Sequence, residues 1–341
     1  MIIDLEAHLF PQVYVKTLKE NDNYPKLIWS FDKELLFMID ENYPIPRTTT
    51  IERLTNLELR LNDMDKTNTD MQVLSLAIPA LNLHNPKLAK KLAAGCNDEI
   101  SSIVERYPDR FVGMASIDVG NGSDSIDELK RAIFDLGFKG VSFQSNYDDK
   151  YLENQEFLEI YSEINKMKVP IFIHPTISRL RNFDQYTSSK SGRFLLGPAF
   201  GFTFDAGFSY LRMVYSGVFD KFPNIKIIMA HLGEALPFII KRLDFPFTHR
   251  TTNNEETFPL KKKPSDYLRD NLFVNTSGNY NEFALELVSK TLGPEKIVYG
   301  SDYPFETMES AIAFVRGSCL SDSQKESVFW KNLSKLMHIK I

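Results

Sequence analysis

Eight short apolar, β-rich runs alternate with amphipathic stretches along this chain, and that alternation restricts its fold more than any other feature. We predict strands at residues 1–8, 71–79, 111–118, 140–145, 169–175, 225–233, 271–278 and 296–304. Strands that alternate with helices pair in parallel. Eight such strands can close a barrel, and runs that are apolar almost throughout are typical of a parallel sheet covered on its outer face by helices. The sequence therefore predicts an α/β fold, a (β/α)8 TIM barrel, with residues 1–341 as a single domain.

A doubly wound open sheet is the structural alternative. Such a sheet favours a glycine-rich phosphate-binding turn after the first strand, and this chain has none there. Within the barrel, two segments exceed the usual length of a loop: residues 9–50 after the first strand and residues 176–207 after the fifth. Long loops in compact domains are commonly functional. Because both segments are rich in aromatic residues, we expect packed loops at the rim of an active site.

Composition excludes several classes of function. The net charge is −5 and no segment accumulates a basic patch, which disfavours a nucleic-acid partner. No uninterrupted apolar run is long enough to span a membrane. Only two cysteines occur, Cys96 and Cys319, too few for a disulfide framework. We therefore expect a cytoplasmic protein with no membrane partner.

Ionisable side chains stand at the ends of four predicted strands, where the active sites of such barrels lie. They are Glu6 and His8 on the first strand, His174 on the fifth, His231 on the sixth and Asp302 on the eighth. Each has an ordinary alternative, since a single histidine can be a hydrogen-bonded core residue, an aspartate can cap a helix and Glu6 can pair with a lysine. Their convergence on one rim favours a metal site. Zinc and manganese both accept such mixed ligands.

The other three histidines, His84, His249 and His338, lie in polar loops or the terminal tail, and we assign them no function. No serine stands in the Gly-x-Ser-x-Gly arrangement of a nucleophile elbow, and no P-loop is present.

Five motifs are spread over nearly the whole chain: YPDRF (107–111), GFKG (137–140), GVFDKFP (217–223), HLGEALP (231–237) and SDYP (301–304). With the strand-end residues, they resemble the amidohydrolase superfamily, and within it the metal-dependent nonoxidative decarboxylases of aromatic acids, such as the γ-resorcylate, 2,3-dihydroxybenzoate and 5-carboxyvanillate decarboxylases. The resemblance implies that the metal ligands are Glu6, His8, His174 and Asp302. It further implies that His231 assists proton transfer and that Glu234 orients His231.

The first strand separates the branches of this superfamily. Hydrolytic members usually begin with His-x-His, whereas this chain has Glu6-Ala7-His8, the form that the decarboxylase branch shows. The fourth strand ends without the bridging lysine or glutamate of binuclear hydrolases, so the resemblance implies one divalent ion per chain, Zn²⁺ or Mn²⁺. We expect decarboxylation of a small hydroxy-substituted aromatic acid, with Asp302 as the acid that protonates the ring.

Two other activities and one inactive state stay open at this stage. The chain could be a metal-dependent hydrolase of a lactone or amide, or a related hydratase. A catalytically silent barrel is the third possibility, although all the expected site positions are intact. Phe10 and either Arg179 or Arg181 are candidates for the pocket wall, and a solvated position in the loop is the alternative for both arginines. The resemblance also implies a homodimer or homotetramer.

Overall fold

The computed structural model describes residues 1–22, 26–29, 35–40, 43–44, 49–78, 80–81, 86–119, 123–147, 150–176, 195–248 and 260–341. All eight predicted barrel strands are present in it. They are β1 (Ile3–Leu9), β5 (Met71–Leu76), β6 with β7 (Phe111–Gly113 and Ala115–Ser116), β8 (Val141–Gln144), β11 (Ile171–His174), β12 (Ile227–Met229), β13 (Leu272–Asn275) and β14 (Ile297–Val298).

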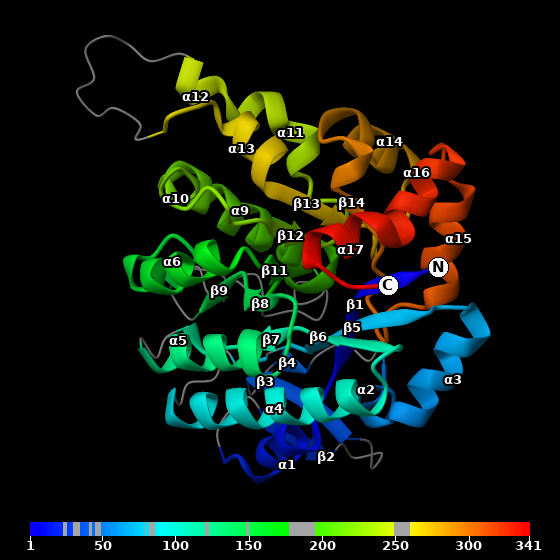
Figure 1. Cartoon of the computed structure of the whole chain (residues 1–341). Helices are drawn as coiled ribbons and strands as arrows, with labels where there is room; N and C mark the ends of the chain where they lie inside the picture. The colour runs from blue at the N-terminus through cyan, green and yellow to red at the C-terminus, as the bar shows by residue number, and fades with distance from the viewer. Residues whose placement is uncertain are drawn as a thin grey trace.

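Neighbouring strands pair in parallel in the order of the sequence, β1–β5–β6 and then β7–β8–β11–β12–β13–β14. The third barrel strand is interrupted at Met114, whose N–H donates to Leu74 of β5, while Ala115 next to it donates to Gly140 ahead of β8. This strand therefore joins the two runs of the sheet (Figure 1).

The last strand returns to the first, and this seam closes the barrel. Leu5 N–H donates to the Tyr299 carbonyl at 3.0 Å, and His8 N–H donates to the Tyr303 carbonyl at 2.7 Å. Beside these bonds, the Asp4 carboxylate accepts from the backbone N–H of Ser301 at 2.9 Å and from its hydroxyl at 2.6 Å. The predicted TIM barrel is confirmed.

Helices surround the strands, as Figure 1 shows. They are α1 (Gln12–Glu20), α2 (Ile51–Thr55), α3 (Leu57–Thr67), α4 (Pro86–Arg106), α5 (Ser123–Lys130), α6 (Leu158–Met167), α9 (Gly201–Tyr215), α10 (Val218–Lys221), α11 (Leu236–Leu243), α12 (Phe245–Thr248), α13 (Pro264–Asn271), α14 (Glu282–Thr291), α15 (Met308–Gly317), α16 (Asp322–Glu326) and α17 (Asn332–Met337). Because strand side chains alternate between the two faces, the strands supply two apolar cores. Ile171 and Ile173 pack outward in the larger cluster, while Phe172 joins Leu5 and Ile228 in the barrel interior.

A β-bulge in β1 decides which side chains of that strand face the barrel interior. Asp4 pairs with Gln72 and Ala7 pairs with Leu74, so β1 has one residue more than β5 between these pairs. Leu5 packs in the interior cluster ahead of the bulge. A regular strand would then turn Glu6 outward, but the extra residue reverses the alternation. Glu6 and His8 consequently both face inward.

The segment after β1 is more regular than the sequence predicted. It contains helix α1 and a small antiparallel sheet of β2 (Lys26–Trp29), β3 (Leu35–Asp40) and β4 (Tyr43–Pro44). Helix α1 begins directly after Pro11 and buries Tyr14, Val15 and Leu18, which lie on one face of the helix and pack toward α4.

The segment after β11 also differs from the prediction. Helix α9 begins at Gly201, so the last part of the predicted loop 176–207 is helical. Arg179 and Arg181 lie outside the described residues. Cys96 is buried and Cys319 exposed, and both are free thiols. Across the described part of the chain, no helix has the length and apolar character needed to cross a membrane.

Candidate active site

Four of the predicted residues converge at the carboxyl end of the barrel. Glu6, His8 and His174 each offer one ligand atom, and these three atoms lie within 4.8 Å of one another. His8 Nε2 lies 3.6 Å from Glu6 Oε1 and 3.2 Å from Asp302 Oδ1. The first, fifth and eighth barrel strands therefore bring two imidazoles and two carboxylates to one point.

His174, His8 and Glu6 each form a hydrogen bond through the atom that faces away from the centre of the site, which leaves another atom of the same side chain to act as a ligand. His174 Nδ1 donates to the Pro175 carbonyl at 2.7 Å, so Nε2 of this ring is left unprotonated. His8 Nδ1 lies 3.1 Å from Ser75 Oγ, which likewise leaves its Nε2 for the site. Asn275 Nδ2 donates to Glu6 Oε2 at 2.9 Å.

The atoms that face the centre of the group have no hydrogen-bond partner among the described residues. Glu6 Oε1 and His8 Nε2 are buried, and neither forms a hydrogen bond with any described residue. The close contact between His8 and Asp302 is not a hydrogen bond either. Buried polar atoms in folded proteins are almost always paired. Two unpaired atoms of ligand type beside a third ligand fit a divalent cation that accepts nitrogen and oxygen donors.

Electrostatics in the group agree with this fit. Burial raises the pKa of Glu6, but His8 and the other nearby histidines outweigh burial and lower it to about 2, so the carboxylate is ionised. Burial and the neighbouring His8 lower the pKa of His174 to about 3, which keeps that ring neutral. Burial lowers the pKa of His8, but Asp302 and Glu6 raise it to about 9. The two carboxylates thus attract a positive charge to His8 Nε2, either a proton or a metal ion.

His231 stands beside this group and is held by Glu234. The two residues lie in a left-handed turn in which every residue from His231 to Ala235 has a positive φ, 84° at Gly233. The turn folds Glu234 back so that its Oε1 lies 2.6 Å from His231 Nδ1. Burial lowers the pKa of His231, but Glu234 raises it to about 10, so this ring is an imidazolium at neutral pH. Burial and the nearby Glu6 raise the pKa of Asp302 above its usual range.

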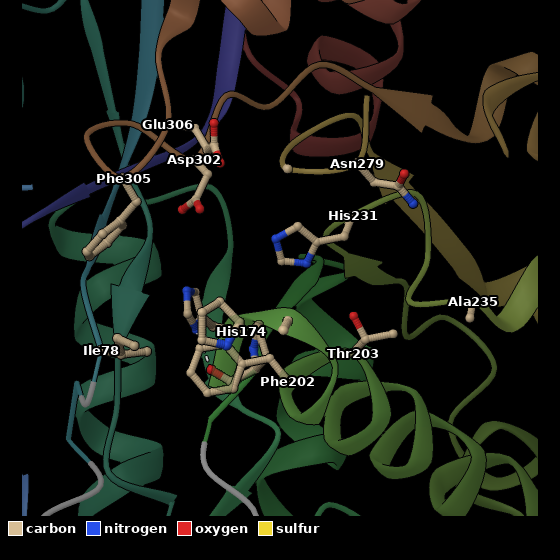
Figure 2. A pocket seen from close by; sticks show the side chains of 14 residues that line it. Ile78, His174, Phe202, Thr203, His231, Ala235, Asn279, Asp302, Phe305 and Glu306 are labelled. Atoms are coloured by element: carbon tan, nitrogen blue, oxygen red, sulfur yellow. Dashed lines mark hydrogen bonds between the residues drawn. The ribbon is translucent and has the colours of Figure 1, made fainter. Parts of the chain in front are cut away.

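A cavity of about 380 Å³ opens over these groups, a size that suits a small organic ligand. In Figure 2, Asp302 and His231 face the same space, with Ile78 and Phe305 on one side and Thr203 on the other. Phe202 and Thr203 enter from α9, and Asn279 comes from the segment after β13. The pocket thus combines apolar side chains with a few polar groups.

The structure corrects one predicted wall residue and adds several that the sequence analysis missed. Phe10 is buried against Tyr14 in a separate cluster and is not among the pocket-lining residues. His338 is exposed at the end of α17, and His84 and His249 lie outside the described residues. Asn275 was missed although it is a polar residue at the end of an apolar strand, the same signal that identified His174.

A comparison with family models decides the family. The model described as Amidohydrolase matches residues 3–336. The chain belongs to the amidohydrolase family. The predicted superfamily is therefore confirmed, and the match spans every strand of the barrel described above.

Relatives and solved structures point to one branch of this family. The chain is 28% identical over 315 residues to a γ-resorcylate decarboxylase of Polaromonas sp., covering 89% of this chain and 93% of that protein. The crystal structure of 5-carboxyvanillate decarboxylase from Sphingomonas paucimobilis matches with a TM-score of 0.87 and 26% identity over 99% of both chains. A dihydroxybenzoic acid decarboxylase from Polaromonas sp., solved with bound manganese and the inhibitor 2-nitroresorcinol, matches with a TM-score of 0.83 and 25% identity, covering 99% of this chain and 97% of that one.

Proposed function

We propose that this protein is a metal-dependent nonoxidative decarboxylase, a carbon–carbon lyase that releases carbon dioxide from a hydroxy-substituted aromatic acid. One observation carries the proposal: buried ligand atoms of Glu6 and His8, with no hydrogen bond to any described residue, meet His174 beside a pocket sized for a single ring. The decarboxylase names of the relatives supply the reaction class.

Glu6, His8, His174 and Asp302 would hold one divalent ion per chain. We favour Mn²⁺ over Zn²⁺ because the related dihydroxybenzoic acid decarboxylase was solved with manganese. When bound, the ion supplies a chelation point for a carboxylate and an ortho hydroxyl and stabilises their negative charge. Asn275 and Ser75 orient two of the ligands, since each bonds the side of the group that faces away from the ion.

Asp302 and His231 would carry the proton. Burial beside Glu6 raises the pKa of Asp302, as an acid that works near neutral pH requires. Asp302 protonates the ring carbon that bears the carboxylate, the carbon–carbon bond then breaks, and its electron pair restores the aromatic ring as carbon dioxide leaves. His231, kept protonated by Glu234, relays a proton to Asp302 for the next turnover.

Hydrolysis of a lactone or amide loses its support, because the reported relatives are decarboxylases. A catalytically silent barrel is disfavoured because Glu6 Oε1 and His8 Nε2 are buried and have no partner in the part of the chain that the structure describes. An inactive protein would gain stability by replacing such atoms with apolar groups.

The first test joins metal analysis with an assay. We would load the purified protein with Mn²⁺, count the metal per chain, and measure carbon dioxide release from salicylate, 2,3- and 2,6-dihydroxybenzoate and 5-carboxyvanillate. The expected result is one ion per chain and release from at least one of these acids. Metal binding without release from any of them would refute the decarboxylase, and no binding would refute the metal site.

Replacing the acid tests its role. Asp302→Asn keeps the size of the side chain but removes the transferable proton, so turnover should fall by about 10³-fold, the middle of the range for acid–base catalysis. Binding of the substrate, followed by calorimetry, should change much less. Substantial residual turnover with an intact metal site would contradict the assignment.

Three broader features belong to the same proposal. We expect one domain over residues 1–341, a cytoplasmic location and a homodimer or homotetramer. Light scattering on the eluate of a sizing column would measure the oligomeric state.

A further inference from the structure

A buried carboxylate outside the metal group connects one wall of the pocket to the barrel. Asp205 lies in α9 with no exposed surface. Its Oδ2 accepts hydrogen bonds from the Ser145 hydroxyl and from Asn146 Nδ2, the latter at 2.7 Å. Its Oδ1 accepts from the Tyr151 hydroxyl at 2.7 Å. One side chain of the helix thus gathers three donors from the segment that follows β8.

The network continues from Ser145 to the fifth barrel strand. Ser145 Oγ accepts from the Thr176 N–H at 2.9 Å, so its own hydrogen is directed to Asp205. Ser145 N–H donates to the His174 carbonyl at 2.9 Å. The end of β8, the turn after β11 and helix α9 therefore meet at a single carboxylate.

Helix α9 carries two residues of the pocket wall on the turn just ahead of Asp205. Phe202 and Thr203 line the cavity, and Figure 2 shows both on the side of the pocket below His231. Farther along the same helix, Arg212 lies over the Tyr151 ring at 5.0 Å, so Tyr151 is held from two sides. These contacts to the segment after β8 thus hold α9, and with it Phe202 and Thr203, in position at the pocket.

We propose that Asp205 is a positioning residue that sets substrate affinity by holding the α9 wall of the pocket against the ends of β8 and β11. It touches neither the substrate nor the metal ligands' free atoms, so its effect reaches the aromatic ring of the substrate through Phe202 and Thr203. The proposal rests on the proposed decarboxylase function. We expect this network to determine the Michaelis constant, whereas metal binding and proton transfer depend on the side-chain atoms of the metal ligands and of His231.

The test uses Asp205→Asn in the Mn²⁺-loaded full chain. An amide accepts through one oxygen only and its NH₂ donates, so the three donors can no longer all be satisfied. We expect KM to rise about tenfold or more, with kcat within about threefold of wild type and with the same manganese content. Ser209→Ala is the matched control, because Ser209 is also buried in α9 and its hydroxyl forms no hydrogen bond with any residue that the structure describes. Its KM and kcat should equal those of wild type.

Three outcomes overturn the proposal: an unchanged KM in Asp205→Asn, a loss confined to kcat, or an equal rise of KM in Ser209→Ala. Tyr151→Phe, which removes one donor and keeps the ring, guards against a folding failure and should raise KM by a smaller factor. Hydrogen exchange of the α9 amides needs no substrate and should accelerate in Asp205→Asn but not in Ser209→Ala. If wild type releases no carbon dioxide, the proposed function fails, and unchanged exchange in Asp205→Asn would then overturn the positioning role separately.

Discussion

Gly278 makes room for the His231 ring, so a single methyl group at this position should displace the ring. A Cβ at residue 278 would lie 2.5 Å from His231 Cδ2 and 3.0 Å from its Nε2. Ordinary contact begins near 3.4 Å, so Gly278→Ala requires the ring to move by about 0.9 Å or the backbone to shift. A misplacement of about 1 Å in a catalytic group can cost about 100-fold in rate. We therefore expect kcat to fall by about 100-fold while manganese still binds.

The same substitution also costs stability. The φ of Gly278 is +61°, and an alanine there costs about 1–2 kcal/mol, with about 1–3 kcal/mol more from the steric overlap. Gly137→Ala is the matched control, because Gly137 has a φ of +71° but no atom within 4 Å of the added Cβ. Urea denaturation should show the conformational cost in both variants and the overlap cost in Gly278→Ala alone. A kcat in Gly278→Ala within about threefold of that in Gly137→Ala would refute the reasoning.

Two further predictions concern the partners of the site residues. Burial lowers the pKa of His231, but Glu234, together with Glu6 and Asp302, raises it from 6.5 to about 10. The charged His231–Glu234 pair therefore stabilises the folded state fully below pH 6.5, and the contribution is lost as the pH rises toward 10. In Glu234→Gln the pKa of His231 should fall, and the alkaline loss of kcat should begin at a lower pH than in wild type; an unmoved pH–rate profile would contradict the pairing. Asn275→Ala removes the hydrogen bond to Glu6, and the manganese dissociation constant, measured by calorimetry, should rise about 10–100-fold; an unchanged constant would exclude the orienting role.

The sequence predicted the barrel and the converging residues because both depend on short-range patterns. An apolar strand such as β11 ends in a histidine, and parallel strands bring their carboxyl ends to one rim. The bulge in β1 could not be predicted, because it depends on the pairing with β5 rather than on a glycine or proline. The predicted sixth strand was too long for a similar reason. The strand ends at Met229, and His231 lies in a left-handed turn. Gly233 is the one residue in the sequence that indicates this turn.

The pocket wall was the least predictable part. Helix α9 begins inside a segment rich in glycine and phenylalanine, a composition that favours a loop. Its position depends on Asp205 and on donors about sixty residues earlier in the chain. Such contacts join distant segments and leave no periodic pattern for a single sequence to reveal.

The seam between the first and last strands has a consequence for the order of events during synthesis. Asp4 and Ser301, whose hydrogen bonds join these strands, are 297 residues apart, and closing a loop of that length costs about 5 kcal/mol in chain entropy. A nascent chain on the ribosome therefore holds Glu6, His8 and His174 long before Asp302 has been translated. In the proposed metal site, Asp302 joins the other three ligands only when the last strand docks. Binding of the proposed ion to all four ligands would thus follow the docking of the last barrel strand and would not guide the earlier steps of folding.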